Sequence, residues 1–420
     1  MQTERSILHV DINNCYASIE ARHHPELRGK CIVVGGDVEA RHGIVLAKSQ
    51  EAKAYGVKTG EVLWQAKQKC PGLIILPPNY PLYLQFSRQI RGLLAEYTSQ
   101  VEPFGLDECW LDVTGSKHLF GDGESIAQQI RHRVKEELGV TVSVGVSFNK
   151  IFAKLGSDMK KPDAVTVITK EDYQQKVWPL PAEDLLYVGR ATQRKLYSRG
   201  ITTIGGIANT DPELLHDWFG KWGYVLHVFA NGQDTATVAR VGDEAVIKSV
   251  GNSTTTPRDI CNLQDAKIVF YNLAESVAAR LREQGLKGRT IQIGVRDNAL
   301  SCFERQMRLP QPTCVSDEIC RAALRLLAES YDWKRPLRSI GVRAVDLVSA
   351  GGDVQLSLLS DDRKRERQEH LDRAVDDIRR RFGHYAIARA VMATDPTLRQ
   401  FDAKGDHSSD GSCFVRCVSK

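Results

Sequence analysis

The chain has 420 residues, of which 42% are hydrophobic and 26% are charged, and its formal net charge is +5. That length exceeds what one hydrophobic core accommodates and predicts about three or four domains. No apolar run approaches the roughly 18–20 residues that cross a bilayer, and the first residues lack the layout of a signal peptide. We therefore expect a cytoplasmic protein without a membrane segment.

The distribution of charge and the spacing of the cysteines indicate possible ligands. Between Lys248 and Val345 the sequence has 16 lysines and arginines against 10 acidic residues. A locally basic segment in a nearly neutral chain is typical of a protein that holds a polyanion on one face. None of the ten cysteines forms a C-x-x-C pair, so the sequence does not predict a zinc site and favours a reduced, cytosolic protein.

The apolar periodicity of the first 168 residues predicts strands and helices that together form one α+β unit. Strands are expected at 6–12, 31–34, 109–113 and 142–146, and helices from residue 16 and at 49–55, 82–97 and 124–138.

After Pro179 and Pro181 the sequence predicts a small helical region to about residue 238. Residues 245–348 then alternate strand and helix. Around 289–296 and again near 340, apolar residues alternate with polar and basic ones, which predicts a sheet with one face on helices and one outward. The outward face either lies along phosphates or is an ordinary solvated face.

One further helix is expected beyond residue 349, at 361–382. Its apolar stripe is expected to pack on a neighbour; it consists of Leu371, Val375, Ile378 and Phe382.

Two acidic positions lie about ninety-five residues apart, each next to an apolar strand. Asp11 closes the run Ile7 to Val10, and Asp107-Glu108 opens the run Cys109 to Leu111 after a turn. Three carboxylates on neighbouring strands form an oxygen site suited to Mg²⁺. Two such ions roughly 3.5–4 Å apart can hold the attacking and leaving oxygens of a phosphoryl transfer. The alternative is that these residues are solvated caps of strands.

The sequence has neither a Walker-A loop nor a G-x-G-x-x-G motif, so a nucleotide needs another kind of site. Lys150 and Lys154 are one helical turn apart, and Lys161 follows the expected helix. Lysines act as point charges for phosphates, although a solvated helix face explains the same pattern.

Three motifs occur in order: V-D-I-N-N-C-Y-A-S-I-E, L-D-E-C-W-L-D-V, and S-V-G-V-S-F-N-K-I-F-A-K-L-G-S-D-M-K-K-P. Together they resemble the Y family of translesion DNA polymerases, and the resemblance covers roughly residues 5–348. It implies a multidomain α+β fold, a right-hand polymerase with palm, small fingers, helical thumb and an α/β little finger. The implied boundaries are 1–14 and 79–168 for the palm, 15–78 for the fingers, 169–240 for the thumb, 245–348 for the little finger and 349–420 for a tail.

The resemblance implies that Asp11, Asp107 and Glu108 are catalytic and bind two Mg²⁺ ions, with the carbonyl of Ile12 as a further ligand. Tyr16 is at the position of the steric gate, which excludes a ribose 2′-hydroxyl. Gln50 and Lys53 depart from the tyrosine and arginine of many relatives, and Lys53 lacks the bidentate fork of arginine. The residues implied to bind the dNTP are Asn14, Cys15, Tyr16, Gln50, Lys53 and Lys161.

Residues 188–201 resemble a helix-hairpin-helix, in which main-chain N–H groups near Gly189 contact DNA phosphates. Ala191 replaces the second glycine of that motif. In the little finger, Arg289, Arg296 and Arg343 are the expected DNA contacts. The tail sequence Gln355-Leu356-Ser357-Leu358-Leu359 resembles the peptide that docks on the bacterial sliding clamp.

The function implied is low-fidelity, template-directed synthesis across lesions without proofreading. The expected partners are primer-template DNA, dNTPs and the sliding clamp, and the protein is expected to be a monomer. One alternative is a catalytically inactive Y-family scaffold that binds clamp and DNA. Another is a nucleotide cyclase, which also uses paired carboxylates but needs neither a thumb nor a clamp peptide.

Overall fold

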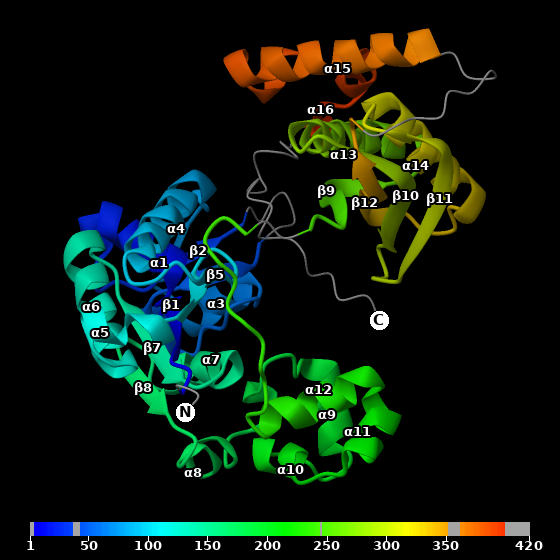
Figure 1. Ribbon diagram of the computed structural model, residues 1–420. Coiled ribbons are helices and arrows are strands. Elements are labelled where there is room, and N and C mark those ends of the chain that lie inside the picture. The colour runs from blue at the N-terminus through cyan, green and yellow to red at the C-terminus, as the bar shows by residue number, and fades with distance from the viewer. Residues whose placement is uncertain (1–3, 37–42, 244–245, 352–361, 400–420) are drawn as a thin grey trace. The chain divides into compact units, whose positions relative to one another are not determined.

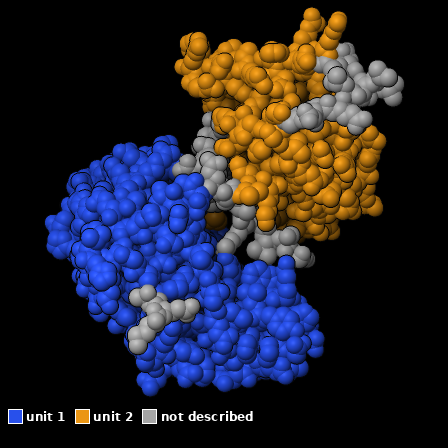
Figure 2. Space-filling view, viewed as in Figure 1, with its two compact units in different colours: residues 1–34, 45–244 blue, residues 35–44, 245–420 orange. Residues whose placement is uncertain are grey.

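The structure is a computed structural model in which residues 4–36, 43–243, 246–351 and 362–399 are described. The chain divides into two compact units, residues 1–34 with 45–244 and residues 35–44 with 245–420 (Figure 2). No helix among the described residues is long and apolar enough to span a membrane.

A five-stranded sheet forms the centre of the first unit. Its order is β5-β6-β1-β7-β8, in which β1 pairs antiparallel with both β6 and β7. The strands are β1 (Ile7–Ile12), β5 (Val101–Pro103), β6 (Glu108–Asp112), β7 (Val142–Ser147) and β8 (Val165–Ile168).

Helices cover both faces of this sheet because side chains alternate along each strand. Leu8, Val10 and Ile12 point to one face, into a core shared with α1 (Cys15–His23), α4 (Tyr80–Ala95) and α6 (Gly123–Arg133). Helix α7 (Lys150–Met159) lies on the opposite face (Figure 1). The helix expected over 124–138 is α-helical only to Arg133 and becomes π-helical over Val134–Leu138.

A smaller three-stranded sheet, of order β3-β2-β4, follows α1 in the chain. It consists of β2 (Ile32–Gly35), β3 (Val45–Lys48) and β4 (Ile74–Leu76), with α2 (Gln50–Ala54) and α3 (Leu63–Lys69). Its core contains Val33, Val45, Leu63 and Ala66.

The last part of the first unit is helical, as the sequence predicts. Its core is built from residues such as Leu185, Leu196, Leu215 and Leu226. The helices are α8 (Tyr173–Val177), α9 (Arg190–Tyr197), α10 (Ile204–Ala208), α11 (Pro212–Phe219) and α12 (Lys221–Ala230), and the short α5 (Lys117–Phe120) lies earlier in the unit.

The second unit is a four-stranded antiparallel sheet of order β11-β10-β12-β9 under two helices. Ile291, Ile293 and Val342 pack against Phe270 and Leu273 of the covering helix α13. The elements are β9 (Ser249–Ile260), α13 (Leu263–Glu283), β10 (Leu286–Asp297), β11 (Cys302–Thr313), α14 (Ser316–Ser330), β12 (Leu337–Ser349), α15 (Asp362–Phe382) and α16 (Pro396–Arg399).

Helix α15 docks on this unit through charged residues (Figure 1). Asp372 is buried; it accepts hydrogen bonds from the main-chain N–H and the hydroxyl of Ser316 and pairs with Arg282 at 3.2 Å. Leu371 and Phe382 are instead 58% and 73% exposed. The expectation that the apolar stripe packs on a neighbour is therefore wrong for these two residues, because buried ion pairs hold the helix.

Candidate functional site

The two acidic positions come together at one end of the central sheet. Asp11 on β1 is the register partner of Glu108 on β6. Asp107 directly precedes β6, and its carbonyl accepts a 2.9 Å hydrogen bond from the N–H of Ile12. Because the N–H and C=O of one strand residue point to the same side, the carbonyl of Ile12 also faces Asp107. The prediction that the carboxylates lie on neighbouring strands is confirmed.

Helix α7 lies unusually close to the sheet beside these carboxylates. A Cβ added to Gly145 of β7 would stand 1.9 Å from the carbonyl oxygen of Ala153, and one added to Gly156 would stand 3.2 Å from Cα of Gly145. At position 145 only glycine leaves room for this approach, and at position 156 a side chain would be tightly packed. The helix thereby brings Lys154, and Lys161 beyond its end, to the carboxylates.

Each of two carboxylates is paired with one lysine. Nζ of Lys154 lies 2.5 Å from Oε2 of Glu108, and Nζ of Lys161 lies 2.7 Å from Oδ2 of Asp11. Three carboxylates against two lysines leave an excess of negative charge. Among the described residues, no three acidic, histidine or cysteine side chains converge closely enough to hold a metal as they stand.

Burial and charge drive the pKa values of these carboxyls apart. Burial raises the pKa of Asp11 to about 7, although Lys161 acts against it. Burial also raises the pKa of Asp107, and the neighbouring charge of Glu108 adds to the effect. Burial opposes the ionisation of Glu108, but His9 and Lys154 outweigh it and lower the pKa of Glu108 to about 2. Strongly perturbed carboxyls in one place are typical of a functional site.

Behind Glu108 lies a buried histidine that the sequence analysis missed. Nε2 of His9 is 3.3 Å from Oε2 of Glu108, and its Nδ1 is 2.8 Å from Oγ of Ser157. Its ring packs edge-on against Trp110. His9 and Asp11 are two residues apart on a strand and so share a face, which is the signal that could have identified it.

Lys150 does not reach the carboxylate site. Its Nζ pairs with Oε1 of Glu102 at 2.6 Å and lies 4.5 Å from the ring centre of Trp110. The prediction that Lys150 belongs to a phosphate-binding cluster is wrong, because it is buried in a structural ion pair.

The start of α1 borders the carboxylates. Asn14 has left-handed dihedral angles (φ 50°, ψ 37°), and its side chain does not cap the helix. The thiol of Cys15 is buried, and burial together with the charges of Asp107 and Asp11 raises its pKa. The uncapped N–H groups at this helix start are an anion-binding feature next to the acidic site.

Tyr16 is fixed in a cluster of three tyrosines. Its ring stacks on Tyr83 with centroids 4.2 Å apart and meets Tyr80 edge-on. The hydroxyl of Tyr83 donates a 2.5 Å hydrogen bond to the buried Glu20. The orientation of the Tyr16 ring is thus set by a neighbour that is itself anchored.

The other residues expected to bind the nucleotide are not on the strands that carry the carboxylates. Gln50 and Lys53 are on α2, and Lys53 is exposed. Within the described part of the chain, no hydrogen bond or ion pair joins them to Asp11 or Glu108. In the helical region, Gly189 is the N-cap of α9, and no side chain at this cap accepts a hydrogen bond from the first N–H groups of the helix. Gly189, Arg190 and Ala191 are exposed.

The three candidate arginines of the second unit lie on β10 and β12. Arg296 and Arg343 point away from α13, since the alternate residues Val295 and Val342 are in the core. Gly251, opposite Arg343, has no side chain, and a Cβ there would meet Cβ of Arg343 at 2.8 Å. Arg289 is exposed at a register shift between Gly288 and Thr290 in the pairing of β10 with β11. The clamp-like peptide Gln355 to Leu359 lies outside the described residues.

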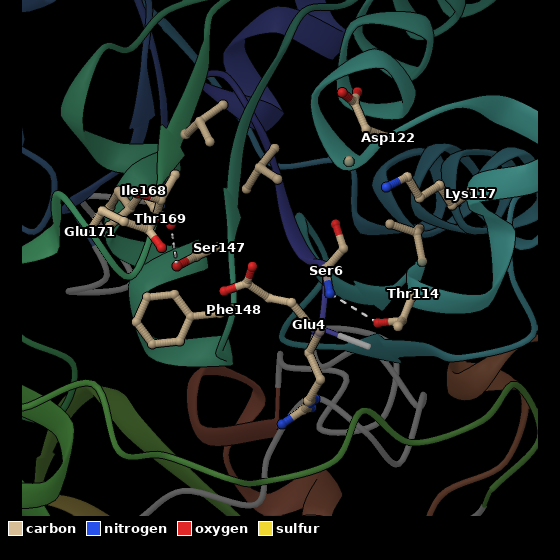
Figure 3. A pocket seen from close by; sticks show the side chains of 15 residues that line it. Glu4, Ser6, Thr114, Lys117, Asp122, Ser147, Phe148, Ile168, Thr169 and Glu171 are labelled. Atoms are coloured by element: carbon tan, nitrogen blue, oxygen red, sulfur yellow. Dashed lines mark hydrogen bonds between the residues drawn. The ribbon is translucent and has the colours of Figure 1, made fainter. Parts of the chain in front are cut away.

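A cavity of about 290 Å³ lies at the opposite end of the central sheet (Figure 3). It is bordered by Ser6 and Ser147, near Ile7, which is four residues or about 13 Å of strand from Asp11. Two hydrogen bonds join groups of its lining: Ser6 N–H donates to Thr114 Oγ1 at 2.9 Å, and Ser147 Oγ donates to the carbonyl of Ile168 at 2.8 Å. This cavity is separate from the carboxylate site.

Comparison with known proteins identifies the family. Residues 10–158 match the impB/mucB/samB family, and residues 247–358 match the C-terminal domain of that family. A DNA polymerase IV of Acetivibrio thermocellus is 53% identical over 397 residues, which are 94% of this chain and 100% of that protein. The chain belongs to the Y family of DNA-directed DNA polymerases.

Other relatives of the Y-family chain agree with this assignment. A DNA polymerase IV of Pelotomaculum thermopropionicum is 38% identical over 402 residues, covering 96% of this chain and 99% of that protein. A solved Y-family DNA polymerase chimera has a TM-score of 0.74 at 25% identity and covers 82% of this chain and 99% of its own. The fold is the multidomain α+β right hand with palm, small fingers, helical thumb and little finger. The exact domain boundaries stay predictions.

Proposed function

We propose that this Y-family polymerase synthesises DNA across damaged templates with low fidelity, by transferring nucleotides from dNTPs to a primer 3′-hydroxyl with two Mg²⁺ ions. The observation that carries the proposal is that Asp11 and Glu108 stand opposite each other on neighbouring strands, next to Asp107. That acidic end of the sheet borders the N-terminus of α1 and Lys161.

The residues present fit a hard divalent cation. The donor set consists of three carboxylates and the carbonyl of Ile12, all oxygen ligands, which Mg²⁺ prefers. Burial and an excess of negative charge make the ionised carboxylates costly without a cation. Mg²⁺ bound there would favour ionisation of the primer hydroxyl and neutralise charge on the triphosphate. Asp11, Asp107, Glu108 and Ile12 are the proposed ligands.

The lysines and the helix start would bind the triphosphate. Lys161 pairs with Asp11, and we expect its ammonium to exchange that carboxylate for a phosphate oxygen when the triphosphate binds. The N–H groups of Asn14 and Cys15 would donate to other phosphate oxygens. Gln50 and Lys53 would complete the nucleotide site from the fingers.

Sugar selection would depend on Tyr16. A ring stacked on Tyr83 cannot turn aside easily, because Glu20 anchors Tyr83 from behind. A ribose 2′-hydroxyl would therefore meet the ring, whereas deoxyribose would not. This supports Tyr16 as the residue that excludes ribonucleotides.

The remaining parts of the proposal concern DNA and partners. Arg289, Arg296 and Arg343 would contact phosphates on the open face of the little finger, and Gly189 would offer main-chain N–H groups from the thumb. The peptide Gln355 to Leu359 would bind the sliding clamp. We further propose a cytoplasmic monomer that acts at the nucleoid and lacks proofreading.

Primer extension tests the proposal. Purified protein would be given Mg²⁺ and dNTPs on undamaged and abasic templates, beside Asp107→Ala/Glu108→Ala. We expect template-directed extension on both templates, reduced roughly 10³-fold or more in that variant because the charge stabilisation is lost. Glu136→Ala, which removes an exposed carboxylate of the same unit, serves as the control and should extend normally. Folded, DNA-binding wild type that never extends a primer would instead favour the inactive scaffold.

A further inference from the structure

Asn13 is a buried amide two residues after Asp11, only 3% exposed. Its main chain is fixed, since its N–H donates to the carbonyl of Thr141 at 2.9 Å and its carbonyl accepts from the hydroxyl of Ser18 at 2.6 Å. The side chain therefore projects from a rigid point at the end of β1.

The hydrogen bonds of this side chain are short and mutually consistent. Oδ1 accepts from the main-chain N–H of Asp163 at 2.8 Å and from the hydroxyl of Thr141 at 3.0 Å. Nδ2 donates to Oγ of Ser143 at 2.8 Å. The N–H of Asp163 can only donate, so the amide oxygen must face it. The hydrogen-bond network thus assigns one orientation to the amide.

Asp163 is held from its other side by α6 and by the π-helical segment that follows it. Nη1 of Arg131 contacts both the carbonyl oxygen of Asp163, at 3.2 Å, and its Oδ1, at 3.0 Å. Nζ of Lys135 lies 2.9 Å from Oδ2. Residue 163 is therefore fixed through its N–H, its carbonyl and its carboxylate.

Lys161 lies two residues before this fixed point, just as Asp11 lies two residues before Asn13. The two segments are thereby joined twice, by the ion pair of Asp11 with Lys161 and by the hydrogen bond of Asn13 with Asp163. If the ammonium of Lys161 leaves Asp11, the second bond still holds the main chain of its loop.

We propose that Asn13 is a positioning residue which, through the main chain of Asp163, holds Lys161 where it meets the incoming triphosphate. This rests on the proposed function, in which Lys161 binds a phosphate. A neutral amide is suited to the task because it anchors the loop without adding a fourth carboxylate beside Asp11, Asp107 and Glu108.

The test is the steady-state KM for dNTP and the kcat of primer extension. Asn13→Leu keeps the volume and removes the amide, and it is expected to raise KM for dNTP about fivefold or more while kcat changes less than about twofold. Arg131→Gln weakens the other side of the same anchor from a half-exposed position, and it should raise KM in the same direction. Ser143→Ala leaves the bond to Asp163 intact and should not change KM.

A double-mutant cycle separates positioning from general damage. If Asn13 acts through Lys161, Asn13→Leu/Lys161→Ala has the KM of Lys161→Ala alone, because the anchor has nothing left to hold. Additive effects on KM, or an unchanged KM in both Asn13→Leu and Arg131→Gln, would overturn the inference. If Asn13→Leu does not fold, Arg131→Gln and its double variant with Lys161→Ala decide. A wild type without extension would refute the proposed function instead, which is a different result.

Discussion

Two adjacent carboxyls of the site have pKa values shifted in opposite directions. The pKa of Asp11 is raised to about 7 and that of Glu108 is lowered to about 2, although both are largely buried. The difference arises because Glu108 has both His9 and Lys154 beside it, whereas the burial of Asp11 outweighs its single lysine. A metal ion must therefore compete with a proton at Asp11 near neutral pH, since ligands bind metals in their deprotonated form.

This asymmetry makes Asp11 a cost to the stability of the metal-free protein. In the folded protein the pKa of Asp11 lies above its ordinary value of 3.8. The stability that this raised pKa contributes to the fold is therefore fully present below about pH 3.8 and is lost as the pH rises through about 7. Asp11→Asn removes the charge but keeps the shape. In EDTA we expect Asp11→Asn to melt about 2–4 °C or more above wild type at pH 8. The gain should be smaller at pH 5, as followed by calorimetry at both values. A gain that is larger at pH 5 would contradict the assigned environment of Asp11.

At the residue scale, the sequence predicts the site best where an acidic residue directly adjoins a recognisable apolar strand. Asp11, Asp107 and Glu108 were expected on neighbouring strands, and the register pairs Asp11 with Glu108. The sequence does not reveal His9 and Asn13, because a histidine within a strand or an asparagine just after it looks the same whether or not it serves a site. Lys150 was misplaced because helical spacing alone does not reveal that Glu102, from another strand, takes its charge.

At the scale of elements, the distance between α7 and β7 decides whether the site exists. Lys154 and Lys161 reach their carboxylates because Gly145 and Gly156 let the helix lie against the strand. Gly145 lies in the stretch S-V-G-V-S, and Gly156 lies six residues before Pro162, which ends the same motif. The sequence does not reveal which backbone comes close to them.

Gly145→Ala tests this packing. Its Cβ would be 1.9 Å from the Ala153 oxygen, so α7 must move. We expect the free energy of unfolding to fall by about 1–3 kcal/mol in denaturant titrations, with loss of primer extension. Gly92→Ala is the matched control, because Gly92 is exposed within α4 and nothing lies within 4 Å of its Cβ. There alanine should stabilise by roughly 0.5–1 kcal/mol. Equal effects of the two substitutions would show that α7 is not held as described.

Strands and amphipathic helices were predicted well because burial imposes their periodicity. The helix expected at 82–97 is α4 (Tyr80–Ala95), with Phe86, Ile90 and Leu94 buried. Helix α15 shows the limit of this reasoning. Its charged residues look solvated in the sequence, yet Asp372 is buried among Arg282, Arg389 and Ser316. Complementary charges on a distant helix are not visible in a local pattern.

At the scale of the whole molecule, the chain consists of two compact units, and the network around Asp372 belongs to the second. Three groups converge on this carboxylate: the start of α14 at Ser316, Arg282 of α13 and Arg389. Removing one member of a buried charge network leaves the others uncompensated. The tail helix is thus part of the stability of the second unit.

Asp372→Ala should destabilise the second unit by about 3–5 kcal/mol and leave the first unaffected. Calorimetry of the full chain would resolve this as one transition that shifts down while the other stays. Asp377→Ala is the control, because Asp377 is 57% exposed and pairs with Arg380 at the surface. If both transitions moved together, or if Asp377→Ala had the same effect, the network would not have the role described.

The central claim is that Asp11, Asp107 and Glu108 hold the ions that catalyse nucleotide transfer. Anomalous scattering from Mn²⁺ in crystals of the full chain with primer-template and a non-hydrolysable dNTP tests it most directly. We predict two peaks roughly 3.5–4 Å apart, between these three carboxylates and the triphosphate. Well-ordered nucleotide with Mn²⁺ peaks elsewhere, or with no peak at these carboxylates, would contradict the account.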